Sequence, residues 1–227
     1  GEVIWKPDMV AAVLRRAFHR LRNGRPGPVI IEVPNDIGTQ EVPAASFQYQ
    51  PPKRHTQAPS SSAVREAVRL LLAAKKPLIQ SGMGTLLAGA SAELRELAEL
   101  LDIPVYCTMP GKSGFDERHP LSLGSGSGAT GRHARTCIQE CDVLMALGSS
   151  LTRTGYGQPI PDGKVMIHNT ESIEDIDKDY SIEVGLPGDT RLTTQMLVEE
   201  VKAQLGKTGR KGQGTVAAEI ARIGGPD

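Results

Sequence analysis

Apolar positions in residues 63–205 follow two patterns that alternate along the chain. Short continuous apolar runs are typical of strands buried on both faces, and apolar residues three or four positions apart are typical of amphipathic helices. The continuous runs predict strands at residues 77–80, 103–108, 143–147, 165–168 and 182–184. The second pattern predicts helices at residues 63–72, after an N-cap at Ser62, and at 88–101, 133–140 and 192–205. This alternation favours an α/β fold: a doubly wound, Rossmann-like parallel sheet of about six strands with helices on both faces.

The first part of the chain has a different character. Helical spacing runs from Val10 to Leu21, and a continuous apolar run at residues 28–33 predicts a strand buried on both faces. One helix and one strand cannot enclose a core by themselves, so we interpret residues 1–42 as an appended remnant of a truncated neighbouring domain. Residues 43–62 are rich in Pro, Gln and Ser and predict a linker. The predicted division continues with a central domain at 63–206, and a linker with the start of a further helix at 207–227.

Composition narrows the function further. Lysine plus arginine and aspartate plus glutamate both number 26, so the chain has no overall charge that would attract nucleic acid. No apolar run reaches the length of about 18 to 20 residues that a membrane-spanning helix needs, and residues 1–8 lack the apolar core of a signal peptide. We therefore expect no nucleic-acid partner, no membrane association and a cytoplasmic location.

Side chains that could carry catalysis or bind a metal are scattered. Cys107, Cys137 and Cys141 form neither a disulfide framework nor a paired zinc-binding unit, and we expect them to be buried. The five histidines match no HExxH or GxSxG motif. The acidic run at residues 175–179 lacks the glycine and glutamate of a calcium loop and predicts a solvated surface. We therefore predict no catalytic and no metal-binding residue.

Three glycine-containing loops follow predicted strands. Gly82 and Gly84 lie after the first strand, where they favour either a phosphate cradle or a structural turn, because Leu87 replaces the third small residue of a dinucleotide motif. Residues 124–131 predict a second loop that opens a helix, and Gly148 follows the strand 143–147. In a parallel sheet the three loops share one edge, where ligands bind. Residues predicted from these loops to bind a cofactor are Gly82, Gly84, Gly148 and Ser149.

Five segments, in this order, carry a resemblance to a known family. They are residues 27–37 (GPVIIEVPNDI), 74–84 (AKKPLIQSGMG), 103–124, 141–148 (CDVLMALG) and 188–189 (GD). Together they resemble thiamine-diphosphate-dependent enzymes of the acetolactate synthase, benzoylformate decarboxylase and oxalyl-coenzyme A decarboxylase group. The first segment is similar to the end of the family's pyrimidine-binding domain, and the remaining segments are similar to its central domain.

The resemblance implies a parent enzyme that decarboxylates or joins 2-keto acids with thiamine diphosphate and Mg²⁺, as a lyase or transferase. In that family an activating glutamate lies early in the pyrimidine-binding domain, and a GDG motif with a downstream asparagine holds Mg²⁺ and diphosphate. Residues 161–163 and 188–190 do not match that motif. We therefore expect this chain to be a fragment that is inactive alone and does not bind thiamine diphosphate. Its expected partners are the pyrimidine- and diphosphate-binding domains of the same polypeptide, in a homodimer or homotetramer.

The resemblance also raises FAD or ADP as ligands of the central domain. Flavin-dependent relatives carry a Gly-small-Arg-Phe-Asp run where residues 148–152 read GSSLT, and an acidic residue where Thr170 stands. We place Thr170 and Asp189 with the cofactor-binding residues, and expect weak or no flavin binding and a vestigial nucleotide site that uses backbone amides. The alternative is a free-standing nucleotide-binding module that regulates a partner without catalysis.

Overall fold

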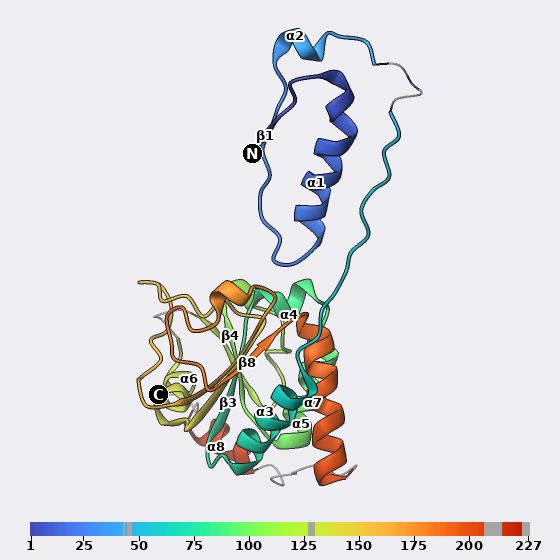
Figure 1. The fold of residues 1–227 in the computed structure, drawn as a ribbon. Coiled ribbons are helices and arrows are strands. Elements are labelled where there is room, and N and C mark those ends of the chain that lie inside the picture. The colour runs from blue at the N-terminus through green and yellow to red at the C-terminus, as the bar shows by residue number, and fades with distance from the viewer. Residues whose placement is uncertain (43, 45–46, 127–129, 207–214, 224–227) are drawn as a thin grey trace. The chain divides into compact units, whose positions relative to one another are not determined.

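The computed structural model describes residues 1–42, 44, 47–126, 130–206 and 215–223 of the 227-residue chain. The chain divides into two compact units, residues 1–56 and residues 57–227 (Figure 1). The division falls inside the stretch 43–62 that was expected to be a linker. The two units are described separately.

The first unit contains one long helix and a short parallel strand pair. Its elements are β1 (Glu2–Val3), η1 (Pro7–Met9), α1 (Val10–Arg22), β2 (Ile31–Glu32) and α2 (Asn35–Gly38). Only Ile4, Val13 and Ala17 are buried hydrophobic residues among its described residues. Ile30 and Val33 are 65% and 54% exposed, so the prediction that residues 28–33 form a strand buried on both faces is wrong.

The second unit is built on one six-stranded sheet in which every strand pairing is parallel. Its strands are β3 (Pro77–Ser81), β4 (Val105–Thr108), β5 (Ser122–Gly126), β6 (Val143–Leu147), β7 (Val165–Thr170) and β8 (Val184–Pro187). Their order is β5-β4-β3-β6-β7-β8, so the chain first builds outward from β3 and then returns to add β6 on its other side. This order confirms the doubly wound fold and places the topological switch point between β3 and β6.

Helices cover both faces of this sheet. They are α3 (Ser61–Ala73), α4 (Met83–Leu87), α5 (Ser91–Leu101), α6 (Arg132–Glu140), α7 (Thr190–Leu205) and α8 (Thr215–Ile223), with the short turns η3 (Met109–Gly111) and η4 (Ile173–Asp175). In Figure 1, α3, α5 and α7 lie side by side, and α6 lies on the opposite side of the sheet. None of the described helices has the length and apolar character needed to cross a membrane.

Alternate residues of each strand serve the two cores, as the period of two in a strand requires. Ile79 and Met145 pack in the cluster formed with α3, α5 and α7, which we call the first core. Leu78 and Leu144 pack in the cluster formed with α6, which we call the second core. Strands of this kind are apolar at successive positions because both faces are covered. The continuous apolar runs in the sequence therefore identified β3 and β6 correctly.

Several predicted boundaries need correction. Ser60, and not Ser62, is the N-cap of α3, because its side chain accepts a hydrogen bond from Ala63 N. The helix predicted from residue 88 begins at Ser91, and residues 83–87 form α4, which is separated from α5 by Gly89 with a φ of 65°. The strand predicted at 182–184 is instead β8, which begins at Val184. The second linker falls mostly on residues 207–214, outside the described residues.

One strand was missed entirely. Residues 122–126 form β5, although the sequence predicted that a glycine-rich loop begins at Gly124. β5 is an edge strand that pairs only with β4, with an irregular register after Val105. Backbone hydrogen bonding to β4 holds it there although serine and glycine have low strand propensity. The rest of the predicted loop includes residues 127–129, which lie outside the described residues.

Candidate functional site

The six residues predicted to bind a cofactor lie along one edge of the second unit's sheet. Gly82 and Gly84 follow β3, Gly148 and Ser149 follow β6, Thr170 ends β7, and Asp189 comes shortly after β8. Because β3, β6, β7 and β8 are adjacent and parallel, their carboxyl ends meet at the same edge. This is the edge at which open α/β sheets bind ligands.

The three glycines pack backbone against backbone at the switch point. A Cβ atom on Gly82 would lie 2.4 Å from Gly148 O, and one on Gly84 would lie 2.7 Å from Gly148 Cα. A Cβ atom on Gly148, whose φ is 58°, would lie 2.5 Å from Thr85 N. Any side chain at these positions would therefore separate the turn after β3 from the turn after β6. The three glycines are explained by this close approach.

The backbone amides of these glycines already have acceptors within the protein. Gly82 N donates to Leu147 O at 2.8 Å, and Gly84 N donates to Gly148 O at 2.8 Å. Gly148 N donates to the Asn169 Oδ1 atom at 3.2 Å. Of the two interpretations that the sequence left open, this geometry favours the structural turn over the phosphate cradle. Assignment of the six residues to a cofactor stays a prediction.

Two further glycines complete this packing. A Cβ atom on Gly111, in η3, would lie 2.7 Å from Ser81 O, and one on Gly114 would lie 3.0 Å from Gly111 O. Beneath them the buried Ser81 hydroxyl donates to Thr85 Oγ1 at 2.9 Å. The space that a doubly wound fold opens at its switch point is therefore filled here by backbone and small side chains.

Asn169 is a central residue that the sequence interpretation did not single out. Its side chain is fully buried, and its Nδ2 atom donates to Leu186 O at 2.9 Å, Gly188 O at 3.1 Å and Thr193 Oγ1 at 3.1 Å. With the bond from Gly148 N, this one amide joins the ends of β6 and β8 to the first turn of α7. A polar residue within an otherwise apolar strand was the signal that could have identified it.

Thr170 and Asp189 are also engaged within the protein. The Thr170 hydroxyl donates to the Asp175 carboxylate at 3.2 Å and accepts from Ser172 N. Asp189 caps α7 by accepting a hydrogen bond from Leu192 N at 3.0 Å. Asp175 is 5% exposed and pairs with Lys178 at 2.8 Å, so its predicted place on a solvated surface is wrong. The hydroxyl and both carboxylates thus have structural partners.

Several non-covalent interactions hold the segment after Gly148 in place. His168 Nε2 lies 2.7 Å from Ser149 O, and Lys178 Nζ donates to Thr152 Oγ1 at 2.9 Å. The guanidinium of Arg153, the nearest substitute for the arginine of flavin-dependent relatives, lies 4.5 Å from the centroid of the Tyr180 ring. Arg153 NH2 is also 3.6 Å from the Asp162 carboxylate. The cation is therefore engaged by the protein.

His168 is the buried titratable group of this edge. His168 is 0% exposed, and its Nδ1 atom has no hydrogen-bond partner among the described residues. Burial lowers the pKa of His168, while the bond to Ser149 O and the carboxylates of Asp175 and Asp177 oppose that shift. The neutral ring, with a proton on Nε2 donated to Ser149 O, satisfies this environment.

No cluster of three or more His, Cys, Asp and Glu side chains that could hold a metal ion occurs among the described residues. Mg²⁺ bound to a diphosphate commonly takes one or two carboxylates together with phosphate and water oxygens, so it needs no such cluster. The expectation that this chain does not bind thiamine diphosphate with Mg²⁺ stays a prediction.

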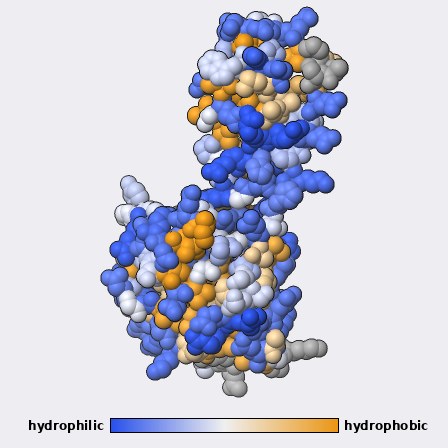
Figure 2. Space-filling model, viewed as in Figure 1, coloured by the Kyte–Doolittle hydropathy of each residue, from blue (hydrophilic) through white to orange (hydrophobic). Residues whose placement is uncertain are grey.

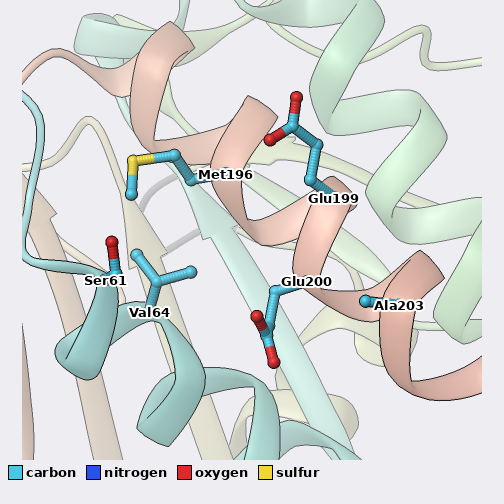
Figure 3. A pocket seen from close by; sticks show the side chains of 6 residues that line it. All are labelled: Ser61, Val64, Met196, Glu199, Glu200 and Ala203. Carbon is cyan, nitrogen blue, oxygen red and sulfur yellow. The ribbon is translucent and has the colours of Figure 1, made fainter.

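Two other surface features belong to the second unit. A shallow groove of about 280 Å³ lies between α3 and α7, lined by Ser61, Val64, Met196, Glu199, Glu200 and Ala203 (Figure 3). At the carboxyl edge, α4 and the neighbouring η3 expose apolar side chains. Separately, Figure 2 shows that apolar residues gather on one face of the second unit within a largely hydrophilic surface. The exposed apolar residues of α4 and η3 are Met83, Leu86, Leu87 and Met109.

Comparison with known proteins identifies the family. The family described as "Thiamine pyrophosphate enzyme, central domain" matches residues 64–197. The acetolactate synthase of Arthrospira platensis is 33% identical over 199 residues, which are 83% of this chain and 34% of that protein. The glyoxylate carboligase of Escherichia coli O157:H7 is 29% identical over 205 residues, 89% of this chain and 34% of that protein. The chain thus spans about a third of the length of these relatives.

A solved structure supports the same fold. The benzoylformate decarboxylase of Polynucleobacter necessarius superposes with a TM-score of 0.72 at 22% identity, covering 87% of this chain and 37% of that protein. The family match includes β3 to β8 and the edge with the packed glycines. This chain therefore belongs to the thiamine pyrophosphate enzyme family, and its second unit is a central domain related to that of the acetolactate synthases.

Proposed function

We propose that this chain is the scaffold part of a thiamine-diphosphate-dependent decarboxylase or carboligase of 2-keto acids, and that its nucleotide site is vestigial. The observation that carries the proposal is the packed switch point. The family's central-domain match coincides with an edge at which the amides of Gly82, Gly84 and Gly148 all donate within the protein. The backbone amides that would bind phosphate oxygens instead donate hydrogen bonds that hold neighbouring loops of this edge together.

Catalysis in this proposal belongs to other domains of the same polypeptide. These are the pyrimidine- and diphosphate-binding domains, and residues 1–42 are the end of the former. The parent is a cytoplasmic homodimer or homotetramer that carries thiamine diphosphate and Mg²⁺. The relatives that are acetolactate synthases and a glyoxylate carboligase support this chemistry.

Calorimetric titration of the purified chain tests the proposal. Thiamine diphosphate with Mg²⁺, FAD and ADP are titrated separately, and pyruvate consumption is measured in the presence of all three. We expect a colourless protein, no saturable binding of thiamine diphosphate or FAD at micromolar concentrations, and no pyruvate consumption above a blank without protein. Saturable micromolar binding of thiamine diphosphate, or copurified stoichiometric flavin, would contradict the scaffold role.

The same titration separates the second candidate function. A free-standing regulatory module of the nucleotide-binding kind would bind ADP saturably without any other domain. Exposed apolar side chains beside the edge, on α4 and η3, favour this candidate because an adenine ring stacks on apolar surface. Micromolar ADP affinity, lost on changing Met83 to Asp while the fold is kept, would replace the scaffold proposal with this one.

A further inference from the structure

The helix α8 lies at the end of the second unit's sheet opposite to the candidate site. In Figure 1 it is found at the end remote from α4, near the helix α6. The Glu219 carboxylate raises the pKa of Lys76, which precedes β3, after the nearer effect of Glu140. Glu219 also acts on Cys137 in α6. Contacts between α6 and α8 place α8 at the amino end of the sheet, beside α6.

The attachment of α8 is light. None of its nine residues is fully buried. Val216 packs partly buried against the first core, and Ile220 packs partly buried against the second core. Through these two residues the helix packs on both cores, and we call them its anchors. A helix of this length is not stable by itself in water, so release of the anchors would also unwind it.

Cys137 lies in α6, the helix that contacts α8. It is half-buried and belongs, with Ile220, to the partly buried residues that pack on the second core. Burial first, and the Glu219 carboxylate second, raise the pKa of Cys137 to about 11. By contrast, Cys107 in β4 and Cys141 beside β6 are buried, and Cys141 Sγ donates to Ile138 O at 3.4 Å. Cys137 thus packs on the second core together with Ile220 of α8, whereas the other two thiols are buried within the cores.

We propose that α8 is a releasable strap and that its release exposes the Cys137 thiol to electrophiles. With a maleimide as the electrophile, the thiolate sulfur forms a bond to one alkene carbon, the other alkene carbon takes a proton from water, and nothing leaves. While the strap is docked, both the approach of the reagent and formation of the thiolate are opposed. Release removes the cover and the neighbouring carboxylate together.

Maleimide labelling of the whole chain, followed by peptide mass spectrometry, tests the strap. Ile220→Asp places a charge at the anchor on the second core, and Ile220→Ala removes most of the anchor without a charge. Ala218→Asp is the matched control, because it adds the same charge at an exposed position of α8. We expect Cys137 labelling to become about tenfold faster in Ile220→Asp and severalfold faster in Ile220→Ala, with Ala218→Asp within about twofold of the unchanged chain.

Glu219→Gln separates the two effects of the strap. It removes the carboxylate and keeps both anchors, so the pKa of Cys137 falls and labelling accelerates less than in Ile220→Asp. Throughout, Cys107 and Cys141 stay slow. The proposal is overturned if both Ile220 variants label Cys137 no faster than Ala218→Asp does. It is also overturned if all three thiols accelerate together in both variants, because α8 then opens only with the cores.

Discussion

Replacing Gly148 by alanine perturbs the switch point at its tightest contact. The new Cβ atom would lie 2.5 Å from Thr85 N and 2.7 Å from Gly84 C, both backbone atoms that cannot rotate away. Gly148 also has a φ of 58°, where a residue with a Cβ atom is strained. Gly163→Ala provides a matched control, since its φ is 82° and nothing lies within 4 Å of the added Cβ atom.

The two variants differ in one energetic contribution. Left-handed backbone strain costs each about 1–2 kcal/mol of unfolding free energy. Gly148→Ala adds the displacement of a packed turn, for which overpacking typically costs about 1–3 kcal/mol. We therefore expect a loss of about 2–5 kcal/mol in Gly148→Ala and about 1–2 kcal/mol in Gly163→Ala.

Urea unfolding followed by far-ultraviolet circular dichroism measures this difference. Tryptophan fluorescence is unsuitable, because the single tryptophan, Trp5, belongs to the first unit. The reasoning requires that Gly148→Ala lower the unfolding midpoint more than Gly163→Ala, with an unchanged slope. Equal losses in the two variants would refute the claim that backbone contact, and not φ alone, requires glycine at 148.

Three further predictions concern polar side chains of the second unit. Asn169→Ala should lower the free energy of unfolding in urea by about 2–4 kcal/mol, because Gly148 N and the carbonyls of Leu186 and Gly188 lose their shared hydrogen-bond partner. A loss below about 1 kcal/mol would show that the network is dispensable. Because the pKa of His168 is lowered in the folded chain, the unfolded chain binds the proton at higher pH than the folded chain does. The free energy of unfolding should therefore be largest above about pH 6.5 and should fall as the pH decreases toward the folded pKa, with a smaller pH dependence in His168→Gln. An equal pH dependence in the two proteins would contradict this assignment. Burial raises the pKa of Asp142, but hydrogen bonds from the backbone amides of Lys75 and Lys76 outweigh this effect and lower the pKa. Asp142→Asn should therefore lower the free energy of unfolding above about pH 4 and change it little below the folded pKa. Thermal unfolding at pH 7 and at pH 3 would show this difference.

The strands could be predicted from the sequence where packing on both faces of the sheet requires apolar residues at successive positions. β3 and β6 are apolar at successive positions because each face meets a core, and this pattern is specific. β5 was not predicted, because its serines and glycines do not form such an apolar pattern and its position depends on pairing with β4. Likewise, residues 28–33 are apolar like a buried strand, yet only Ile31 and Glu32 pair with another strand, because a strand also needs partners that the sequence pattern does not reveal.

The sequence predicted the place of the candidate edge, but it could not show how the backbone amides there are engaged. Glycines after consecutive strands correctly indicated loops at one edge of the sheet, since strand direction follows from the βα alternation. Whether a glycine admits a ligand or another loop depends on contacts between segments far apart in sequence, here Gly82 and Gly148. The role of Asn169 is also non-local, because its partners lie on β8 and α7. Such contacts leave only a weak signal in a single sequence.

The packed switch point is tested most directly by nuclear magnetic resonance of the amide groups of Gly82, Gly84, Gly148 and Ser149 during titration with ADP. The internal hydrogen bonds predict that the amides of the three glycines exchange slowly with solvent, and that ADP up to millimolar concentration leaves all four resonances unchanged. Saturable shifts of these resonances, with fast exchange of the glycine amides in the absence of ADP, would show that the amides are free to bind phosphate and would contradict the account.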